Sequence, residues 1–234
     1  MYFELPAAIQ AAVDNDLKAL KKAIKDGGDV DASTKSGSTP LIYAAQNSNM
    51  EMIEFLVEKG ADINAKNKIG GTAFNRAAQN GNIEVMKYLL EKGAEIGPLA
   101  IIGASREGHL KAVRFLFDNG ADLSAKNNWG QTPIMLAAKE GHLPVVRFLI
   151  ANGADIRATD KNSDSPLNMA KDNDQPEAAM LLRRAGATEK PKKKPEPVEE
   201  EEEDDDDDDD TDIDIDDSEI PDDLDELPAE EDED

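Results

Sequence analysis

The stretch Thr132–Ile156, TPIMLAAKEGHLPVVRFLIANGADI, contains the start, the turn and the end of a pair of helices. Pro133 suits the first turn of a helix, where a missing N–H has no partner in any case, and Thr132 before it is a suitable cap. Gly141 permits the chain to turn into a second helix, and Gly153 ends that helix. We therefore predict two short helices joined by a tight turn.

The same features return at a regular interval along the chain. A Gly-Ala-Asp-Ile motif, with variants, begins at Gly27, Gly60, Gly93, Gly120, Gly153 and Gly186. These positions are 33, 33, 27, 33 and 33 residues apart. The helix start keeps the same register as Thr39-Pro40-Leu41, Thr72-Ala73-Phe74, Thr132-Pro133-Ile134 and Ser165-Pro166-Leu167. An interval held over this length indicates stacked copies of one structural unit.

The two helices of a unit differ in their predicted core residues. The first helix carries paired alanines, which let it approach its neighbour closely: Ala44-Ala45, Ala77-Ala78 and Ala137-Ala138. The second helix carries apolar residues three positions apart: Ile53 and Leu56, Met86 and Leu89, Val113 and Leu116, Val146 and Leu149. This spacing is typical of the buried face of a helix.

These motifs resemble the ankyrin repeat family, whose unit has 33 residues, a T-P-L-H-x-A signature, a β-turn and two antiparallel helices. The resemblance covers about Leu5 to Thr188 and implies an all-α solenoid of six helix-turn-helix units with β-turn or hairpin connectors. The first and last units are degenerate, as expected of caps with one polar outer face. The signature His is replaced, so its hydrogen bonds must be supplied in other ways; its place is taken by Ile42, Asn75, Met135 and Asn168.

The unit between Gly93 and Gly120 is six residues shorter than the others. Where the others have a hairpin segment, the chain passes from Ile96 through Gly97-Pro98 straight into LAIIGASREGHL. A deletion in a connector leaves the helices stacked, and it opens a notch in the rim near Gly97 and Pro98. The notch is either a gap shaped for a ligand or neutral variation in the length of a loop.

The charge of the chain is concentrated at its end. Residues 1–188 hold 23 acids and 22 Lys or Arg, a net charge of −1, whereas residues 189–234 hold 28 acids and 4 Lys, a net charge of −24. We expect an ankyrin domain over residues 1–188, a Lys/Pro linker over 189–198 and a disordered acidic tail over 199–234, because so charged a segment cannot bury enough apolar surface to fold alone.

Composition also excludes several classes of protein. The absence of Cys removes disulfides, Cys-based zinc sites and thiol nucleophiles. No window approaches the roughly 18 consecutive apolar residues of a membrane span, and the start of the chain does not read as a secretory signal. We expect a cytoplasmic protein, or a nuclear one in a cell with a nucleus, because KPKKKP at Lys190–Pro195 resembles a short nuclear localisation signal.

We expect no catalytic residue, no metal site and no cofactor. The chain has no P-loop, nucleophile-elbow or HExxH motif. Its two histidines, His109 and His142, stand at the repeat interval in Gly-His-Leu, where the resemblance implies a structural role at the start of the second helix. A metal site needs three or four converging ligands, which this pattern does not indicate.

The resemblance implies that a protein partner lies on the concave side, formed by the hairpin tips and the first helices. The implied tip residues are Lys35, Ser36, Lys68, Ile69, Asn128, Trp129, Lys161 and Asn162. The implied first-helix residues are Tyr43, Gln46, Arg76, Gln79, Arg106 and Lys139. Trp129, the one Trp of the chain, is either an interface hot spot or a residue packed on a neighbouring hairpin.

We interpret the chain as a non-catalytic protein-interaction module whose acidic tail either covers the concave groove or binds basic proteins. The apolar residues Ile213, Ile215, Ile220, Leu224 and Leu227 interrupt the acids, as in segments that fold on a partner. Alternatives are a stoichiometric inhibitor that mimics nucleic acid, a regulatory subunit of an enzyme, and a tail that only solubilises. Direct binding to DNA or RNA is disfavoured by the negative charge.

Overall fold

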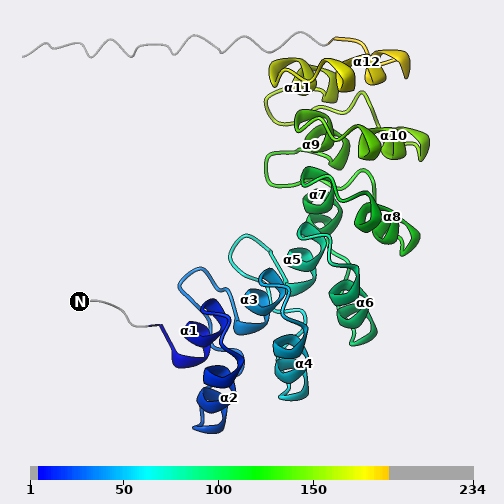
Figure 1. Ribbon diagram of the computed structural model, residues 1–234. Helices are drawn as coiled ribbons and strands as arrows, with labels where there is room; N and C mark the ends of the chain where they lie inside the picture. The colour runs from blue at the N-terminus through cyan, green and yellow to red at the C-terminus, as the bar shows by residue number, and fades with distance from the viewer. Residues whose placement is uncertain (1–4, 190–234) are drawn as a thin grey trace, which may run out of the picture. The chain divides into compact units, whose positions relative to one another are not determined.

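The computed structural model describes residues 5–189. This part of the chain contains twelve helices in six consecutive pairs (Figure 1). The first helices of the pairs are α1 (Ala7–Val13), α3 (Pro40–Gln46), α5 (Ala73–Gln79), α7 (Pro98–Arg106), α9 (Pro133–Lys139) and α11 (Pro166–Asp172). The second helices are α2 (Leu17–Lys25), α4 (Met50–Glu58), α6 (Ile83–Glu91), α8 (Leu110–Asp118), α10 (Leu143–Ala151) and α12 (Pro176–Arg184). The predicted tail, 199–234, and all of the predicted linker except Glu189 lie outside the described residues.

The pairs stack in the order of the sequence (Figure 1). Each first helix contacts the first helix of the next pair, from α1 through α11, and this row continues through α7 of the shortened unit. The second helices α6, α8, α10 and α12 likewise contact their neighbours. The predicted all-α solenoid is therefore confirmed, and within residues 5–189 no helix is long and apolar enough to cross a membrane.

The helix starts follow the predicted cap chemistry, with one exception. The Oγ atoms of Thr39, Thr72 and Ser165 accept hydrogen bonds from the N–H three residues later, at 3.4, 3.2 and 3.2 Å. Thr132 has the same extended backbone, but its Oγ1 has no partner. Its N–H instead donates to Met135 Sδ at 3.3 Å, because the long thioether in the place of the signature His reaches back over the first turn.

The core lies between the two rows of helices, as the sequence predicts. The paired alanines of the first helices are fully or almost fully buried. The four leucines of the second helices, Leu56, Leu89, Leu116 and Leu149, are all 0% exposed. Leu116 belongs to the shortened unit, so the deletion leaves the core intact and changes only the connector.

Of the predicted β-turn or hairpin connectors, four are tight turns, and no strand occurs among the described residues. These tip loops span residues 34–38, 67–71, 127–131 and 160–164. Each is closed by a backbone hydrogen bond between its first and last residues, such as Asn67 N–H to Gly71 C=O at 3.0 Å. Gly70 and Gly130 have φ of 80°, a left-handed conformation that glycine adopts without steric cost.

Candidate functional site

The shortened unit contributes no tip loop to the rim. Its connector runs from Ile96 into Gly97, which precedes α7 directly, and Pro98 is the first residue of that helix. The base of the connector keeps its ordinary link to the preceding unit: Glu95 N–H donates to Asn64 Oδ1 at 2.9 Å, as Asp62 N–H does to Asp31 one unit earlier. The loss is therefore confined to the tip.

The tip loops that flank this position lack the hydrogen bond that joins other neighbouring tips. Lys68 N–H donates to Ser36 C=O at 2.9 Å, and Lys161 N–H donates to Trp129 C=O at 3.0 Å. The corresponding groups on either side of the missing tip are Ile69 C=O and Asn128 N–H. Neither has a hydrogen-bond partner within residues 5–189. The deletion therefore leaves one backbone acceptor and one backbone donor available at the two sides of a gap.

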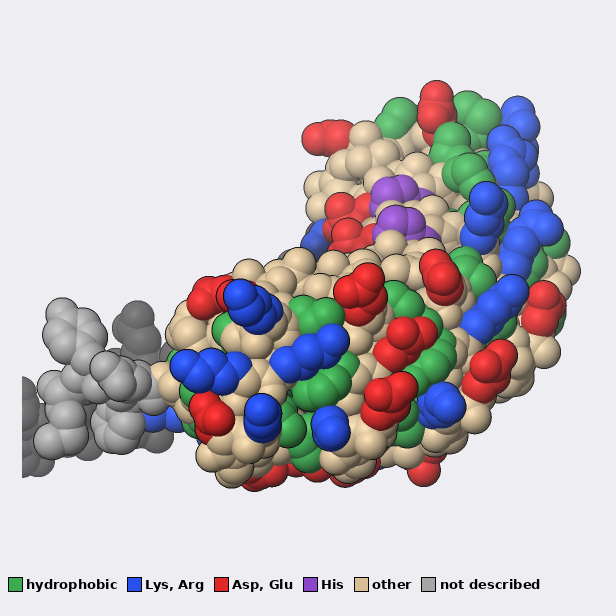
Figure 2. Space-filling model, turned by 60° about the horizontal axis from the view of Figure 1, so that its bottom comes forward, with side chains coloured by type: hydrophobic (Ala, Val, Ile, Leu, Met, Phe, Trp, Pro, Cys, Tyr) green, Lys and Arg blue, Asp and Glu red, His purple; other side chains and the backbone are tan. Residues whose placement is uncertain are grey.

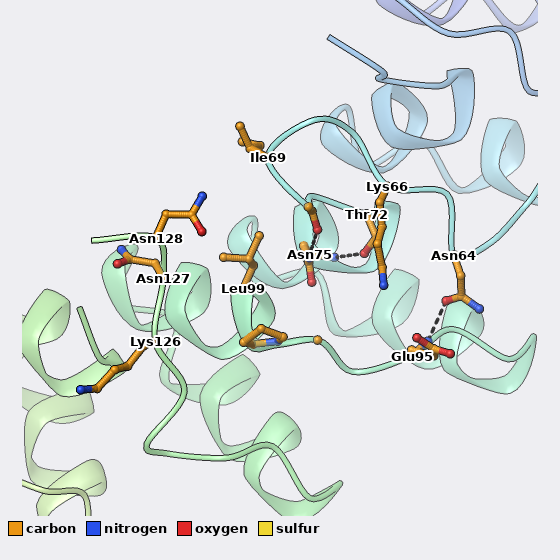
Figure 3. A pocket seen from close by; sticks show the side chains of 13 residues that line it. Asn64, Lys66, Ile69, Thr72, Asn75, Glu95, Leu99, Lys126, Asn127 and Asn128 are labelled. Atoms are coloured by element: carbon orange, nitrogen blue, oxygen red, sulfur yellow. Dashed lines mark hydrogen bonds between the residues drawn. The ribbon is translucent and has the colours of Figure 1, made fainter. Parts of the chain in front are cut away.

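The gap forms a surface pocket, which Figure 3 shows from close by. Two adjoining spaces of about 280 and 310 Å³ share the residues Ile69, Asn75, Leu99, Asn127 and Asn128. We call the combined space the rim cleft; its lining consists of the residues of both spaces, and these five join them. In Figure 3, Ile69 stands on one side, Asn127 and Asn128 stand on the other, and Leu99 rises between them. Gly97 and Pro98, where we expect a notch from the sequence, both line the first space.

Large apolar side chains stand at the two sides of the rim cleft. Ile69 is 65% exposed and Trp129 is 67% exposed, higher fractions than for any other large hydrophobic residue that the structure describes. Both line the second space, together with Ile102 and Leu136. Trp129 therefore leaves most of its surface exposed beside the cleft.

A glycine in α7 deepens the cleft. In register, Gly103 corresponds to Tyr43, Arg76 and Leu136 of other first helices, so the shortened unit lacks a side chain here as well as a tip. Gly103 is inside a helix and its φ is negative, so the backbone does not require glycine. A Cβ added there would meet Gln79 Cβ at 3.4 Å, which is ordinary contact. The missing tip loop and Gly103 are two separate departures from the repeat, and both remove side-chain volume at the rim cleft.

Two buried polar atoms beside the cleft have no partner. Asn75 is 8% exposed. Its N–H donates to Thr72 Oγ1 at 3.2 Å, and its Nδ2 donates to Gly70 C=O at 3.4 Å. Its side chain thus supplies part of the hydrogen bonding expected of the signature His. Asn75 Oδ1 is left without a partner and faces Gly97, where an added Cβ would lie 4.0 Å away. Arg76 Nε is also unpaired. Unpaired buried polar groups are uncommon in folded proteins.

A chain of charged and amide groups crosses the floor from α5 to α7. Arg76 donates to Gln79 Oε1 at 3.0 Å, and Gln79 Nε2 donates to Glu107 Oε1 at 3.4 Å. Arg106 donates to the same carboxylate oxygen from Nε at 3.0 Å and from a terminal nitrogen at 2.8 Å.

Glu107 carries a perturbed carboxyl group as a result. Partial burial would raise its pKa, but the hydrogen bonds from Arg106 and Gln79 outweigh burial and hold the pKa of Glu107 below its usual value. Glu107 therefore stays ionised and remains paired with Arg106.

The structure brings together six of the fourteen residues that the resemblance implies as partner contacts. Ile69, Arg76, Gln79, Arg106, Asn128 and Trp129 line the rim cleft. Six others do not line it: Lys35, Ser36, Tyr43, Gln46, Lys68 and Lys139. Lys161 and Asn162 also lie outside it.

Sequence reasoning missed several residues of the cleft. The missed residues are Asn75, Leu99, Ile102, Gly103, Asn127 and Leu136, with Lys66 and Lys126 at its edge. A signal existed for Gly103, because aligning the units in register shows a glycine in a position of larger residues. No sequence signal pointed to Leu99, because in other units the corresponding residue is the helix cap and is covered by a tip loop.

The two histidines lie side by side in a hollow of the face shown in Figure 2. A Cβ placed on Gly81 would meet the His109 ring at 2.6 Å, and one placed on Gly108 would meet the His142 ring at 2.5 Å. His142 Nε2–H donates to Arg106 C=O at 2.8 Å. Each ring thus packs on the turn of the preceding unit, and no group of three or more His, Asp or Glu able to hold a metal occurs within residues 5–189.

Comparison with protein families gives a match to ankyrin repeats over residues 8–99 and 101–193. No match is found among curated proteins. The match covers most of the chain, and its two segments meet at residue 100, inside the α7 helix of the shortened unit. The repeated motifs, the six helix pairs and this match lead to one conclusion: the chain belongs to the ankyrin repeat family, whose members are generally non-catalytic protein-interaction modules.

Proposed function

We propose that this protein binds an extended, acidic segment of a partner protein in the rim cleft, with a large apolar side chain of that segment seated between Ile69 and Trp129. The observation that carries the proposal is the pair of exposed apolar side chains at the two sides of a cavity where a tip loop is missing. Trp is one of the residue types enriched at interface hot spots.

The chemistry of the cleft supports a polypeptide ligand. Asn128 N–H and Ile69 C=O each offer a backbone hydrogen bond of the kind that neighbouring tips make with each other. An extended peptide satisfies such groups with its own backbone, as in strand addition to the edge of a sheet. Apolar side chains then add affinity where they are covered, and the pocket shape selects among them.

The charges on the cleft support an acidic ligand. Arg76 and Arg106 line the floor, and Lys66 and Lys126 line the edge. Glu95 and Glu107 are the acids nearby, and Glu107 is paired with Arg106. Such a surface favours carboxylates on the ligand and speeds their encounter at low salt.

Selection from a random peptide library tests this function without knowledge of the partner. The library is panned on the full-length protein and on the double variant Ile69→Ser/Trp129→Ser, with Met180→Ser as a matched control because Met180 is 50% exposed on the distant helix α12. We expect the wild type and the control to enrich acidic peptides with one large apolar residue, and the double variant to lose them. Enrichment of the same peptides by all three proteins would contradict the proposal.

A second candidate function belongs to the tail alone. The net charge of −24 over residues 189–234 favours a polyanion that binds basic proteins, or that mimics nucleic acid as a stoichiometric inhibitor. Replacing the acids of Glu199 to Asp210 with Gln and Asn tests it. Capture of polylysine that disappears in this variant and persists in the cleft variant would support the tail function, whereas equal capture by the variant and the wild type would exclude it.

A further inference from the structure

The chain carries, in its own acidic end, a segment of the kind that the rim cleft fits. Residues 211–217 read TDIDIDD, an alternation of Asp and Ile. In an extended backbone, alternate side chains point to opposite sides, so Ile213 and Ile215 would share one side and the aspartates the other. The later apolar residues Ile220, Leu224 and Leu227 do not alternate, and Pro221 among them has no N–H to donate.

We propose that residues 211–217 occupy the rim cleft of the same molecule. This inference rests on the proposed function, because it requires a cleft that binds acidic segments with apolar anchors. One of the two isoleucines lies between Ile69 and Trp129, and a backbone C=O of the segment accepts the hydrogen bond from Asn128 N–H. The neighbouring aspartates lie close to Arg76 and Arg106.

The connecting chain is long enough for this contact. Glu189 Oε1 lies 2.9 Å from Lys171 Nζ and 2.9 Å from an Arg183 nitrogen, so the chain leaves the repeats at the last helix pair. Between Glu189 and Thr211 the extended chain spans up to about 70 Å. The helix α7 is two helix layers from α11, which is about 16–20 Å at 8–10 Å per layer. The segment therefore reaches the cleft with length to spare.

Charge brings the segment to the repeats, and the isoleucines select the cleft. The tail is strongly negative and the cleft carries Arg76, Arg106, Lys66 and Lys126. By charge alone the acidic tail would bind equally well to other basic surfaces, above all to the four exposed lysines of α2: Lys18, Lys21, Lys22 and Lys25. The hollow over those lysines is otherwise lined only by Asp16 and Ala19, so it offers an isoleucine no large apolar side chain to pack against.

Occupation by the same chain makes the segment a competitor of any partner. A tethered segment acts at an effective concentration in the millimolar range. If its affinity as a free peptide is about 100 µM, it fills about nine tenths of the clefts and weakens an external peptide about tenfold. A partner then binds well only when it displaces the tail.

Trp129 reports on the cleft directly because it is the one Trp of the chain. Acrylamide quenching of its emission is measured in the full-length wild type, in Ile213→Ser/Ile215→Ser, and in the matched control Leu224→Ser/Leu227→Ser; all three proteins have the same net charge. We expect stronger quenching in the Ile213→Ser/Ile215→Ser variant alone, with faster hydrogen exchange at the Asn128 amide. Equal quenching in all three proteins would overturn the inference, and a rise only in the control would assign the contact to a different segment and overturn it too.

Two further measurements distinguish failure of this inference from failure of the proposed function, and distinguish a contact within one molecule from a contact between two copies. A peptide selected from the library should bind Ile213→Ser/Ile215→Ser about tenfold more tightly than the wild type. Equal binding would refute tail occupation while leaving the cleft a peptide site, and no binding to either would refute the proposed function itself. Shielding of Trp129 that grows with protein concentration would show a second copy in the cleft and would overturn occupation by the same chain.

Discussion

The junction between the 127–131 and 160–164 tip loops differs from the junction across the shortened unit in its rim and not in its core. At the first junction the tips are joined by the bond from Lys161 N–H to Trp129 C=O. At the second, a tip is absent, yet α5, α7 and α9 stay in contact and Leu116 is as buried as Leu149. The difference teaches that a repeat protein can lose a rim element and keep its helix stack and buried core, because the helices carry the core.

The largest effect that this comparison predicts concerns the core. Leu116→Ala and Leu149→Ala each remove a fully buried side chain, so both should lower the free energy of unfolding by about 2–5 kcal/mol. Urea denaturation of the two variants measures it. A loss from Leu116→Ala far below that from Leu149→Ala would show that the shortened unit is not part of one continuous core.

Restoring the missing tip should strongly weaken peptide binding. A six-residue insertion between Ile96 and Pro98 returns the unit to 33 residues and fills the gap between Ile69 and Asn128. We expect the affinity for library-selected acidic peptides to fall by about 30-fold or more, the cost of losing a hot spot of about 2 kcal/mol. Isothermal titration calorimetry measures it, and unchanged affinity would mean that the rim cleft is not the site.

Removing the exposed Trp should weaken binding without changing stability. Trp129→Ala should cost about 2 kcal/mol of binding free energy, because it deletes one wall of the cleft. Stability should change by less than about 0.5 kcal/mol, since Trp129 is 67% exposed. Met180→Ala serves as the control in the same titrations, and an equal loss from Met180→Ala would argue against a specific role for Trp129.

Two substitutions at Gly103 should have opposite consequences. Gly103→Ala should stabilise the protein by up to about 1 kcal/mol, because alanine is the better helix former and its Cβ meets only Gln79 at 3.4 Å. Gly103→Leu should weaken peptide binding by filling the cleft, while the fold tolerates it as it tolerates Leu136 in the same register. Circular dichroism melts and peptide titrations of both variants measure these effects; undiminished binding by Gly103→Leu would place the ligand elsewhere.

The smallest effect concerns Glu107. Glu107→Gln should raise the affinity for an acidic peptide a few-fold, because it frees Arg106 from its pair, and should change stability by less than about 1 kcal/mol, since both side chains are well exposed. The pKa of Glu107 is lowered in the folded protein, so its stabilising contribution is fully present above the usual carboxyl pKa and is lost as pH falls through the lowered value. Urea denaturation from pH 6 down to pH 3 should therefore show a smaller pH dependence in Glu107→Gln than in the wild type.

The fold could be predicted from the sequence because its signals are local and repeated. Thr-Pro starts, glycine ends and apolar pairs such as Val146 and Leu149 recur in register, so each unit confirms the others. The notch was also predictable, since a spacing of 27 residues among spacings of 33 can be located by aligning glycines.

The contents of the cleft could be predicted only in part. Trp129 and Ile69 follow from their positions on tips, but the pairing of Arg106 with Glu107 and the unpaired Asn75 Oδ1 depend on side-chain geometry between units. Leu99 becomes a cleft residue only because the tip that would cover it is missing. The exposure and pairing of such residues depend on the neighbouring units, so the sequence of a single unit does not reveal them.

The most direct test of the central claim is a titration of the isotope-labelled Ile213→Ser/Ile215→Ser protein with a library-selected acidic peptide, followed by nuclear magnetic resonance. If the missing tip leaves a peptide site, the largest shifts occur at the amides of Ile69, Asn128 and Gly103 and at the indole of Trp129, and they disappear in the protein with the restored tip. Shifts that concentrate on the lysines of α2, or that persist after the tip is restored, would contradict the account.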